Sequence, residues 1–248
     1  MLIKEVIKNV QNEGYYIGTW DSIDEATTIY IDTKTGVQDF YTLLNESDLE
    51  CLPKIVNGTV ANLEKSLVSV PLVIFKKSTP LNRQNSNVKY ALLVGKIAAA
   101  MAKVDGNIDH EEIFQIREDI YKLSFLSDSE KYRVFIRSIY ALQQNLSKDT
   151  IINSFALLSD KAKKQALNIA KDIAIADHHI NRHERLFLYE FYRLCDLPTN
   201  TVDRDLKEHA RTKNVVLENN SSKNVTVTDL IIEMDDSFDQ MLSEFASF

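Results

Sequence analysis

Apolar residues recur at helical spacing almost without a break from Val88 to Arg211, and this stretch most constrains the fold. A sustained 3.6-residue period predicts helices that pack together along one apolar face. Glycine and proline are scarce, with 6 and 4 among 248 residues, whereas an all-β sandwich needs many of both for its turns. The sequence therefore predicts a mainly α protein, with helices over 88–104, 110–123, 128–145, 148–158, 160–176, 182–195 and 200–212.

Small polar residues stand just before several of these ranges, where a helix needs a cap. Ser and Asn side chains accept hydrogen bonds from the free backbone N–H groups of a first helical turn. The predicted N-caps are Ser127, Ser147, Ser159, Asn181 and Asn200.

The N-terminal third has a mixed pattern, in which β-branched and aromatic runs predict strands between helices. The predicted elements are a helix over 1–12, a strand over 27–32, a turn over 33–36, a strand over 37–43, a helix over 59–68 and a strand over 70–75. Pro71 restricts the last strand to a sheet edge, or lies at the strand's start.

Composition changes along the chain predict its domain organisation. The stretch KKSTPLNRQNSN is rich in Ser, Asn and Pro and lacks apolar periodicity, which is typical of a linker. We expect a small α+β region over 1–76, a linker over 77–87, a helical domain over 88–212 and an acidic tail with an amphipathic helix over 213–248.

Charge and cysteine usage exclude several classes of protein. A net charge of −7 argues against direct nucleic-acid binding, which depends on an excess of Lys and Arg. Lys161, Lys163, Lys164 and Lys171 share one predicted helix and fit either a nucleic-acid patch or a solvated face. Two distant cysteines without a C-x-x-C motif indicate a reducing compartment. No leader-like or membrane-spanning apolar run occurs, so we expect a soluble, cytoplasmic protein.

The most distinctive feature is a turn that occurs twice, 72 residues apart. The first copy is Ala102-Lys-Val-Asp-Gly-Asn-Ile-Asp-His-Glu-Glu112, and the second is Ala174-Ile-Ala-Asp-His-His-Ile-Asn-Arg-His-Glu184. Both contain the pattern A-x-x-D-x-x-I-[DN]-x-x-E, and each joins an alanine-rich helix to a more charged one. The repeat predicts two similar helix-turn-helix elements.

Helix capping explains most of this pattern. Asp109 and Asn181 are expected as N-caps, with Glu112 and Glu184 three residues on, and this spacing is that of a capping box. Gly106 can adopt the left-handed conformation that ends a helix, and in the second copy a histidine takes its place at some conformational cost. Capping leaves Asp105 and Asp177 unexplained, although their side chains could accept backbone N–H groups within the turn.

The doubled turn resembles the TerB family, the helical domain named from bacterial tellurite-resistance operons. The likeness covers roughly residues 88–200 and rests on the two turns. It implies an all-helical bundle with two pseudo-repeated helix-turn-helix elements and no established catalytic activity. It also implies a place in tellurite-resistance, chemical-stress or anti-phage defence systems beside ATPases and helicases, and a role linked to divalent cations.

A second interpretation of the same turns is a divalent-cation site. If the two turns pack together, their carboxylates converge, and hard oxygen ligands suit Mg²⁺, Mn²⁺ or Ca²⁺. The candidate ligands are Asp105, Asp109, Glu112, Asp177 and Glu184. An EF-hand is excluded, because its first and third ligand positions would be Met101 and Lys103.

We expect no catalytic residues elsewhere in the chain. No nucleophile elbow, no phosphate-binding P-loop and no dinucleotide-binding glycine motif occurs, so an ATP-driven step would come from a partner. Cys195 is expected to be a core thiol among leucines.

The last twenty residues carry six acidic residues and no Lys or Arg. Apolar residues follow one side of the predicted helix, namely Phe238, Met241, Leu242, Phe245 and Phe248. This arrangement fits a helix that binds in a groove of a basic partner, or equally a helix that packs on its own domain.

These features and the TerB resemblance together lead to one hypothesis, a non-enzymatic TerB-like adaptor. The resemblance implies its place in a bacterial stress-response or anti-phage defence system and its protein partners, such as an ATPase or helicase. The alternative is a divalent-metal sensor or metal-dependent hydrolase built on the paired turns.

Overall fold

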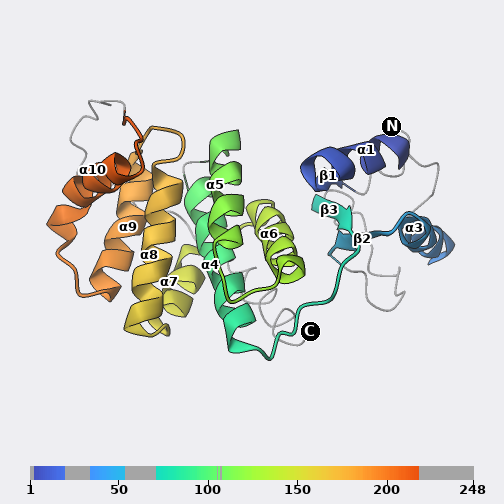
Figure 1. The fold of residues 1–248 in the computed structure, drawn as a ribbon, viewed down its shortest axis with the longest axis horizontal. Helices are drawn as coiled ribbons and strands as arrows, with labels where there is room; N and C mark the ends of the chain where they lie inside the picture. The colour runs from blue at the N-terminus through green and yellow to red at the C-terminus, as the bar shows by residue number, and fades with distance from the viewer. Residues whose placement is uncertain (1–2, 20–33, 54–70, 105, 107, 218–248) are drawn as a thin grey trace. The chain divides into compact units, whose positions relative to one another are not determined.

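The structure is a computed structural model, and it describes residues 3–19, 34–53, 71–104, 106 and 108–217. Helices make up most of these residues, as the sequence predicts, beside one three-stranded sheet (Figure 1). The contacts divide the chain into two compact units. One comprises Met1–Gly95 and Ile120–Gln144, and the other comprises Lys96–Asp119 and Asn145–Phe248. The predicted domain boundaries stay predictions.

The first unit is built around an antiparallel sheet with β3 (Pro71–Lys76) between β1 (Tyr15–Thr19) and β2 (Leu49–Leu52). Pro71 is the first residue of β3, where a missing N–H donor costs the least. The strand is central rather than at an edge, so of the two predicted places for Pro71 the strand start is the one observed. Strands β1 and β2 were not predicted.

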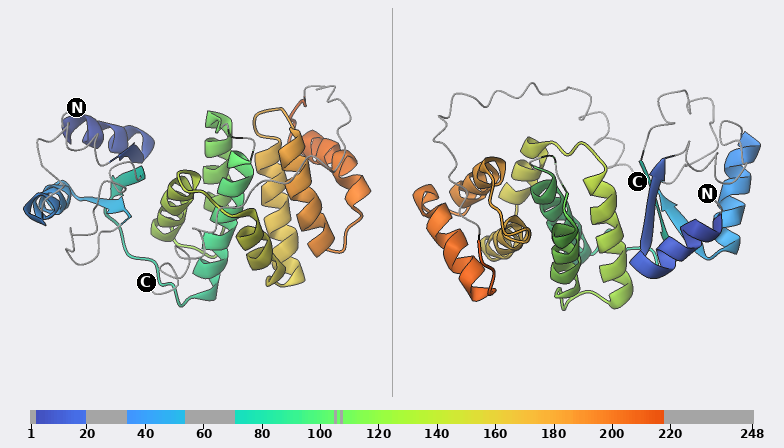
Figure 2. Two further views of the ribbon diagram at one scale, coloured as in Figure 1. Left: turned by 180° about the vertical axis from the view of Figure 1, so that it is seen from behind. Right: turned by 90° about the horizontal axis from the view of Figure 1, so that it is seen from above.

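Both faces of β3 are covered. Leu72, Val73, Ile74 and Phe75 are all buried, although alternate residues of a strand point to opposite faces. On one face, α1 (Ile3–Glu13) and α3 (Lys34–Glu46) share a core with β2 and β3 (Figure 2). On the other, α6 (Asp128–Leu142) contacts β3, with the Tyr132 ring 6.4 Å from that of Phe75 in an edge-on contact. Four consecutive apolar residues are the expected pattern for a strand buried on both faces.

One sequence prediction is wrong in this unit. Residues 33–36 were expected to turn and residues 37–43 to form a strand, but Lys34–Glu46 is the helix α3. Gly36, Phe40 and Leu44 are buried at intervals of four, and the last two belong to the core shared with α1. The helical burial period therefore outweighs the strand preference of the individual residues. The predicted strand over 27–32 and helix over 59–68 lie outside the described residues.

The helices of the second half begin and end close to the predicted positions. They are α4 (Ser86–Lys103), α5 (His110–Tyr121), α6 (Asp128–Leu142), α7 (Lys148–Ala156), α8 (Asp160–Ala174), α9 (Arg182–Leu194) and α10 (Val202–Thr212). Ser127, Ser147, Ser159 and Asn181 are confirmed as N-caps. Asn200 is not a cap, because the short 3-10 helix η2 (Thr199–Thr201) precedes α10 and delays its start.

In the second unit, α9 packs against α7, α8 and α10. Phe191 of α9 stacks on Phe155 of α7 with 4.4 Å between ring centroids, and Phe187 lies 4.8 Å from Phe191. All three rings are fully buried. Aromatic packing at these separations adds to the free energy gained by burying the rings themselves. This core supports both helices of the second predicted turn.

The close approach of α4 and α6 in the first unit gives a testable prediction. A Cβ atom added at Gly95 would collide with Ser138 Oγ and lie 3.5 Å from Ser138 Cβ. Gly95→Ala is therefore expected to lower the free energy of unfolding by about 1–3 kcal/mol. Adding Ser138→Ala removes the colliding atom, and alanine's helix preference of about 1 kcal/mol over glycine then favours the double variant. Urea denaturation of the four proteins measures this coupling, and additive effects would contradict the collision.

Candidate functional site

The second of the two turns has the capping geometry that the sequence predicts. The Asn181 side chain accepts a hydrogen bond from the Glu184 N–H (3.0 Å), and Glu184 Oε2 accepts one from the Asn181 N–H (2.7 Å). Asp177 Oδ1 accepts a hydrogen bond from the His179 N–H (2.9 Å), which gives this aspartate a role inside the turn. His178 has φ +69°, the left-handed conformation expected at this position.

The first turn repeats these features in part. Glu112 Oε2 accepts a hydrogen bond from the Asp109 N–H (2.9 Å), which is one half of a capping box. Gly106 has φ +90° and thus matches His178 in the second turn. Glu112 and Glu184 are 5% and 3% exposed, so both copies bury their glutamate. Asp105 lies outside the described residues.

The described candidate metal ligands differ in burial and in hydrogen bonding. In the ranges that the structure describes, no group of three or more His, Cys, Asp or Glu side chains is arranged to hold a metal ion. Asp109 is exposed, while Glu112 and Glu184 are buried and accept hydrogen bonds from the helix starts. A site that includes Asp105 stays a prediction.

Cys195 differs from its predicted role as a core thiol. It lies half-buried at the C-cap of α9. Burial raises the pKa of its thiol, while the nearby charges of Lys163, Lys164 and Lys171 act to lower it. A raised pKa reduces the thiolate fraction, which is the opposite of what an activated nucleophile requires.

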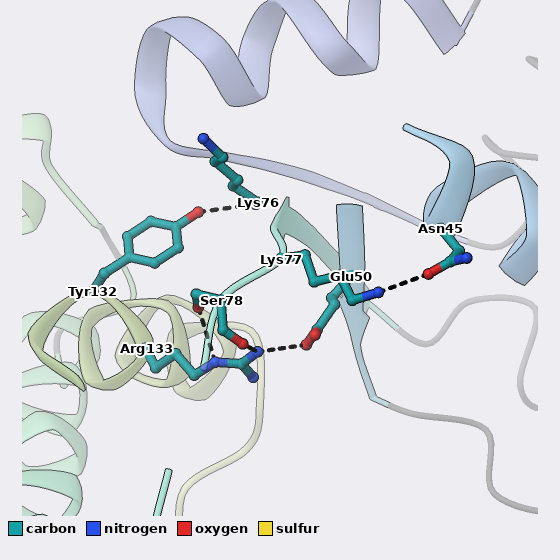
Figure 3. Close-up of polar contacts among 7 residues, drawn as sticks. All are labelled: Asn45, Glu50, Lys76, Lys77, Ser78, Tyr132 and Arg133. Atoms are coloured by element: carbon teal, nitrogen blue, oxygen red, sulfur yellow. Dashed lines mark hydrogen bonds and ion pairs between the residues drawn. The ribbon is translucent and has the colours of Figure 1, made fainter. Parts of the chain in front are cut away.

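A polar network that the sequence did not predict joins α6 to the sheet in the first unit (Figure 3). Arg133 of α6 donates from Nη2 to Glu50 Oε2 of β2 (2.9 Å) and from Nε to Ser78 Oγ (2.9 Å). It also donates to the Ser78 carbonyl oxygen. The side chains of Arg133 and Glu50 are only 10% and 14% exposed, and the guanidinium lies 5.6 Å from the Phe75 ring centre.

Three further hydrogen bonds lie in the same unit as this network. The Tyr132 hydroxyl accepts a hydrogen bond from the Lys76 N–H (2.9 Å) and donates one to the Gly14 carbonyl oxygen (2.8 Å). Lys77 Nζ donates to Asn45 Oδ1 (2.7 Å), as Figure 3 also shows. The one sequence feature that could have indicated this network was Arg133, a charged residue directly before the apolar stretch of α6. Its partners come from distant parts of the sequence and could not be predicted.

A second missed cluster joins α8 to α10 in the second unit. Asp172 is 8% exposed, and its Oδ1 lies 2.6 Å from His209 Nε2 and 3.0 Å from Lys213 Nζ. Burial acts to raise the pKa of Asp172, but the hydrogen bonds and charges of His209 and Lys213 outweigh it and lower that pKa. Beside it, Lys171 Nζ lies 5.0 Å from the Tyr192 ring centre. These contacts hold α10 on α8.

No family model, curated protein or solved structure matches this chain. The resemblance to the TerB family thus rests on the residues of the two turns and stays a prediction. Among the helices in the described ranges, none has an apolar stretch sufficient to cross a membrane.

The Asp172 cluster predicts how stability depends on pH. The folded protein holds the pKa of Asp172 below its ordinary value of 3.8, so the carboxylate stabilises the fold above about pH 4. This stabilisation is lost as the pH falls through the folded pKa. Asp172→Asn is expected to lower the free energy of unfolding by about 1–3 kcal/mol near pH 7. The difference from wild type should shrink below pH 4, whereas Glu208→Gln, an exposed change of equal charge on α10, should show little effect at either pH. A difference that stays constant with pH would contradict this assignment.

Substitutions at the left-handed residue of each turn, Gly106 and His178, are expected to change the free energy of unfolding in different ways. Gly106→Ala meets no atom within 4 Å, so its cost is backbone strain alone, about 1 kcal/mol. His178→Gly relieves the same strain but also removes the exposed contact of His178 Nδ1 with the Val216 carbonyl oxygen (3.1 Å). The free energy of unfolding is therefore expected to stay unchanged or to rise by less than about 1 kcal/mol. Thermal denaturation compares both variants with wild type. If His178→Gly lowered the free energy of unfolding as much as Gly106→Ala does, the strain assigned to His178 would be contradicted.

Proposed function

We propose that this chain is a non-enzymatic TerB-like adaptor of a bacterial stress-response or anti-phage defence system. The observation that carries the proposal is that both buried glutamates accept backbone hydrogen bonds at the start of a helix. Glu112 and Glu184 each accept the N–H three residues earlier, at 2.9 and 2.7 Å. Acidic residues that cap helix starts in this way stabilise the helices. This role explains the doubled motif without a catalytic or metal-binding function.

The packing of the second unit supports a scaffold role. The helix that follows the second turn, α9, is held by aromatic contacts with α7 and by further contacts with α8 and α10. Asp172 binds α10 through both His209 and Lys213. A body held in this way is a rigid platform, and an adaptor needs such a platform to bring partners together.

The partner-binding candidates are Phe238, Met241, Leu242, Phe245 and Phe248, all of which lie outside the described residues. Their helical spacing and the six acidic residues of the same segment favour a basic groove on a partner protein. An ATPase or helicase encoded nearby is the partner class that the TerB resemblance implies.

The second candidate function is a divalent-metal sensor or metal-dependent hydrolase. It is favoured by the same doubling, which puts a buried glutamate and a nearby aspartate in each turn. Calorimetry with Mg²⁺, Mn²⁺, Ca²⁺ and Zn²⁺ separates the two functions. Tight binding that is lost in both Asp105→Ala and Asp177→Ala would favour the metal function over the adaptor.

Affinity capture from the native host tests the adaptor function. The full chain is expected to capture an ATPase or helicase, and deletion of residues 229–248 is expected to abolish that capture. Phe238→Ala with Phe245→Ala should reduce it as the deletion does, because the apolar side would enter the groove. The matched control is Leu157→Ala, an exposed apolar residue of the described part. If the deleted chain kept every partner, the tail would have no part in recruitment.

A further inference from the structure

One side of α8 carries a line of lysines. Lys161 and Lys164 are exposed, and Lys171 is half-buried with its Nζ 5.0 Å from the Tyr192 ring centre. Residues three and seven positions apart share one side of a helix, so these three lysines form a continuous line, here called the lysine stripe. In the part of the chain that the structure describes, no hydrogen bond or ion pair ends on their ammonium groups.

The acidic residues of α8 do not pair with the stripe in the described structure. The helix contains two of them, Asp160 at its first position and Asp172 near its end. Asp172 is buried and binds His209 and Lys213. Asp160 is exposed at the helix N-terminus, where the helix dipole favours a negative charge. An acidic ligand would therefore meet three positive charges along about 15 Å of helix, at about 1.5 Å per residue.

The described part of the chain ends beside α8. Lys213, directly after α10, has its Nζ 3.0 Å from Asp172 Oδ1 of α8. Three residues later, the Val216 carbonyl oxygen lies 3.1 Å from Nδ1 of His178, which belongs to the turn after α8. These two contacts place residues 213–217 next to the C-terminal end of α8, which is also the end where Lys171 lies.

The segment that continues from this point has the opposite charge. Residues 229–248 contain six acidic residues and no Lys or Arg, and they lie outside the described residues. The eleven residues 218–228 span at most about 40 Å, at about 3.6 Å per residue, so residue 229 can reach every part of the stripe. Segments joined by a short stretch of chain meet at an effective concentration of about millimolar. One exposed ion pair contributes little, but several formed together at this concentration hold a segment in place.

We propose that the acidic tail, residues 229–248, binds along the lysine stripe of its own chain. Its Asp and Glu side chains contact Lys161, Lys164 and Lys171. The apolar residues of the tail follow the other side of the predicted helix, so they face away from α8 and stay available to the groove of a partner. The contact stands without the adaptor function, whereas the use of the apolar side rests on that proposed function.

Hydrogen–deuterium exchange of the full chain, measured by mass spectrometry, tests the contact. At low salt, the amides of residues 229–248 are expected to exchange at least about threefold more slowly in wild type than in Lys161→Glu with Lys164→Glu, because a bound segment is protected. Lys4→Glu with Lys8→Glu is the matched control, since both residues are exposed on α1 and the net charge changes equally. The control should exchange like wild type. In about 0.5 M salt the protection should disappear, because exposed charges are screened.

Carbodiimide cross-linking identifies what occupies the stripe, because the reagent joins a lysine amine to a carboxylate in contact with it. Wild type is expected to give amide links between tail carboxylates and the lysines of the stripe. A mixture of isotope-labelled and unlabelled chains shows whether the two ends of a link belong to one chain. Links that join labelled to unlabelled chains would assign the stripe to a second copy and overturn the proposal.

The remaining outcomes are equally decisive. Equal tail exchange in wild type and the stripe variant, or an equal gain in the α1 control, would overturn the proposal. If Phe238→Ser with Phe245→Ser removed the protection while the stripe variant kept it, the tail would pack through its apolar side instead. The stripe variant should melt like wild type, because Lys161 and Lys164 are exposed, so misfolding cannot imitate the effect. Lost partner capture with intact tail protection would reject the adaptor function alone, and the reverse would reject this contact alone.

Discussion

A buried glutamate that accepts the backbone N–H three residues before it is the constraint on which the repeated part of this molecule depends. Such a bond satisfies a donor that the helix itself leaves free, and it fixes the residue at which the helix begins. Glu112 does this for α5 and Glu184 for α9. Because α9 then packs against α7, α8 and α10, the position of its first residue decides which side chains enter the core of the second unit.

The first unit depends on a different interaction, because its central strand, β3, is buried on both faces. The α6 helix covers the face opposite α1 and α3 with apolar contacts and with a buried ion pair, Arg133 to Glu50. Burying charge in this way requires hydrogen-bond partners, which Arg133 finds in Glu50 and Ser78.

The proposed recruitment by the tail would use apolar side chains and negative charge. The paired turns would serve it by giving the helical part a rigid form. A cation held by the turn carboxylates remains the competing interpretation, and it depends on Asp105.

The sequence by itself determined the helices from residue 86 to residue 212, because their apolar period, serine and asparagine caps and scarce glycine all act within one or two turns of chain. It also indicated both turns, down to the left-handed residue at His178. Only the tertiary structure decided that 34–46 is a helix, since its strand-like residues are outweighed by the core that Phe40 and Leu44 enter. The same holds for Arg133 and Asp172, whose partners lie dozens of residues away. Local patterns record how a segment folds, whereas long-range pairs depend on which segments the packing brings together.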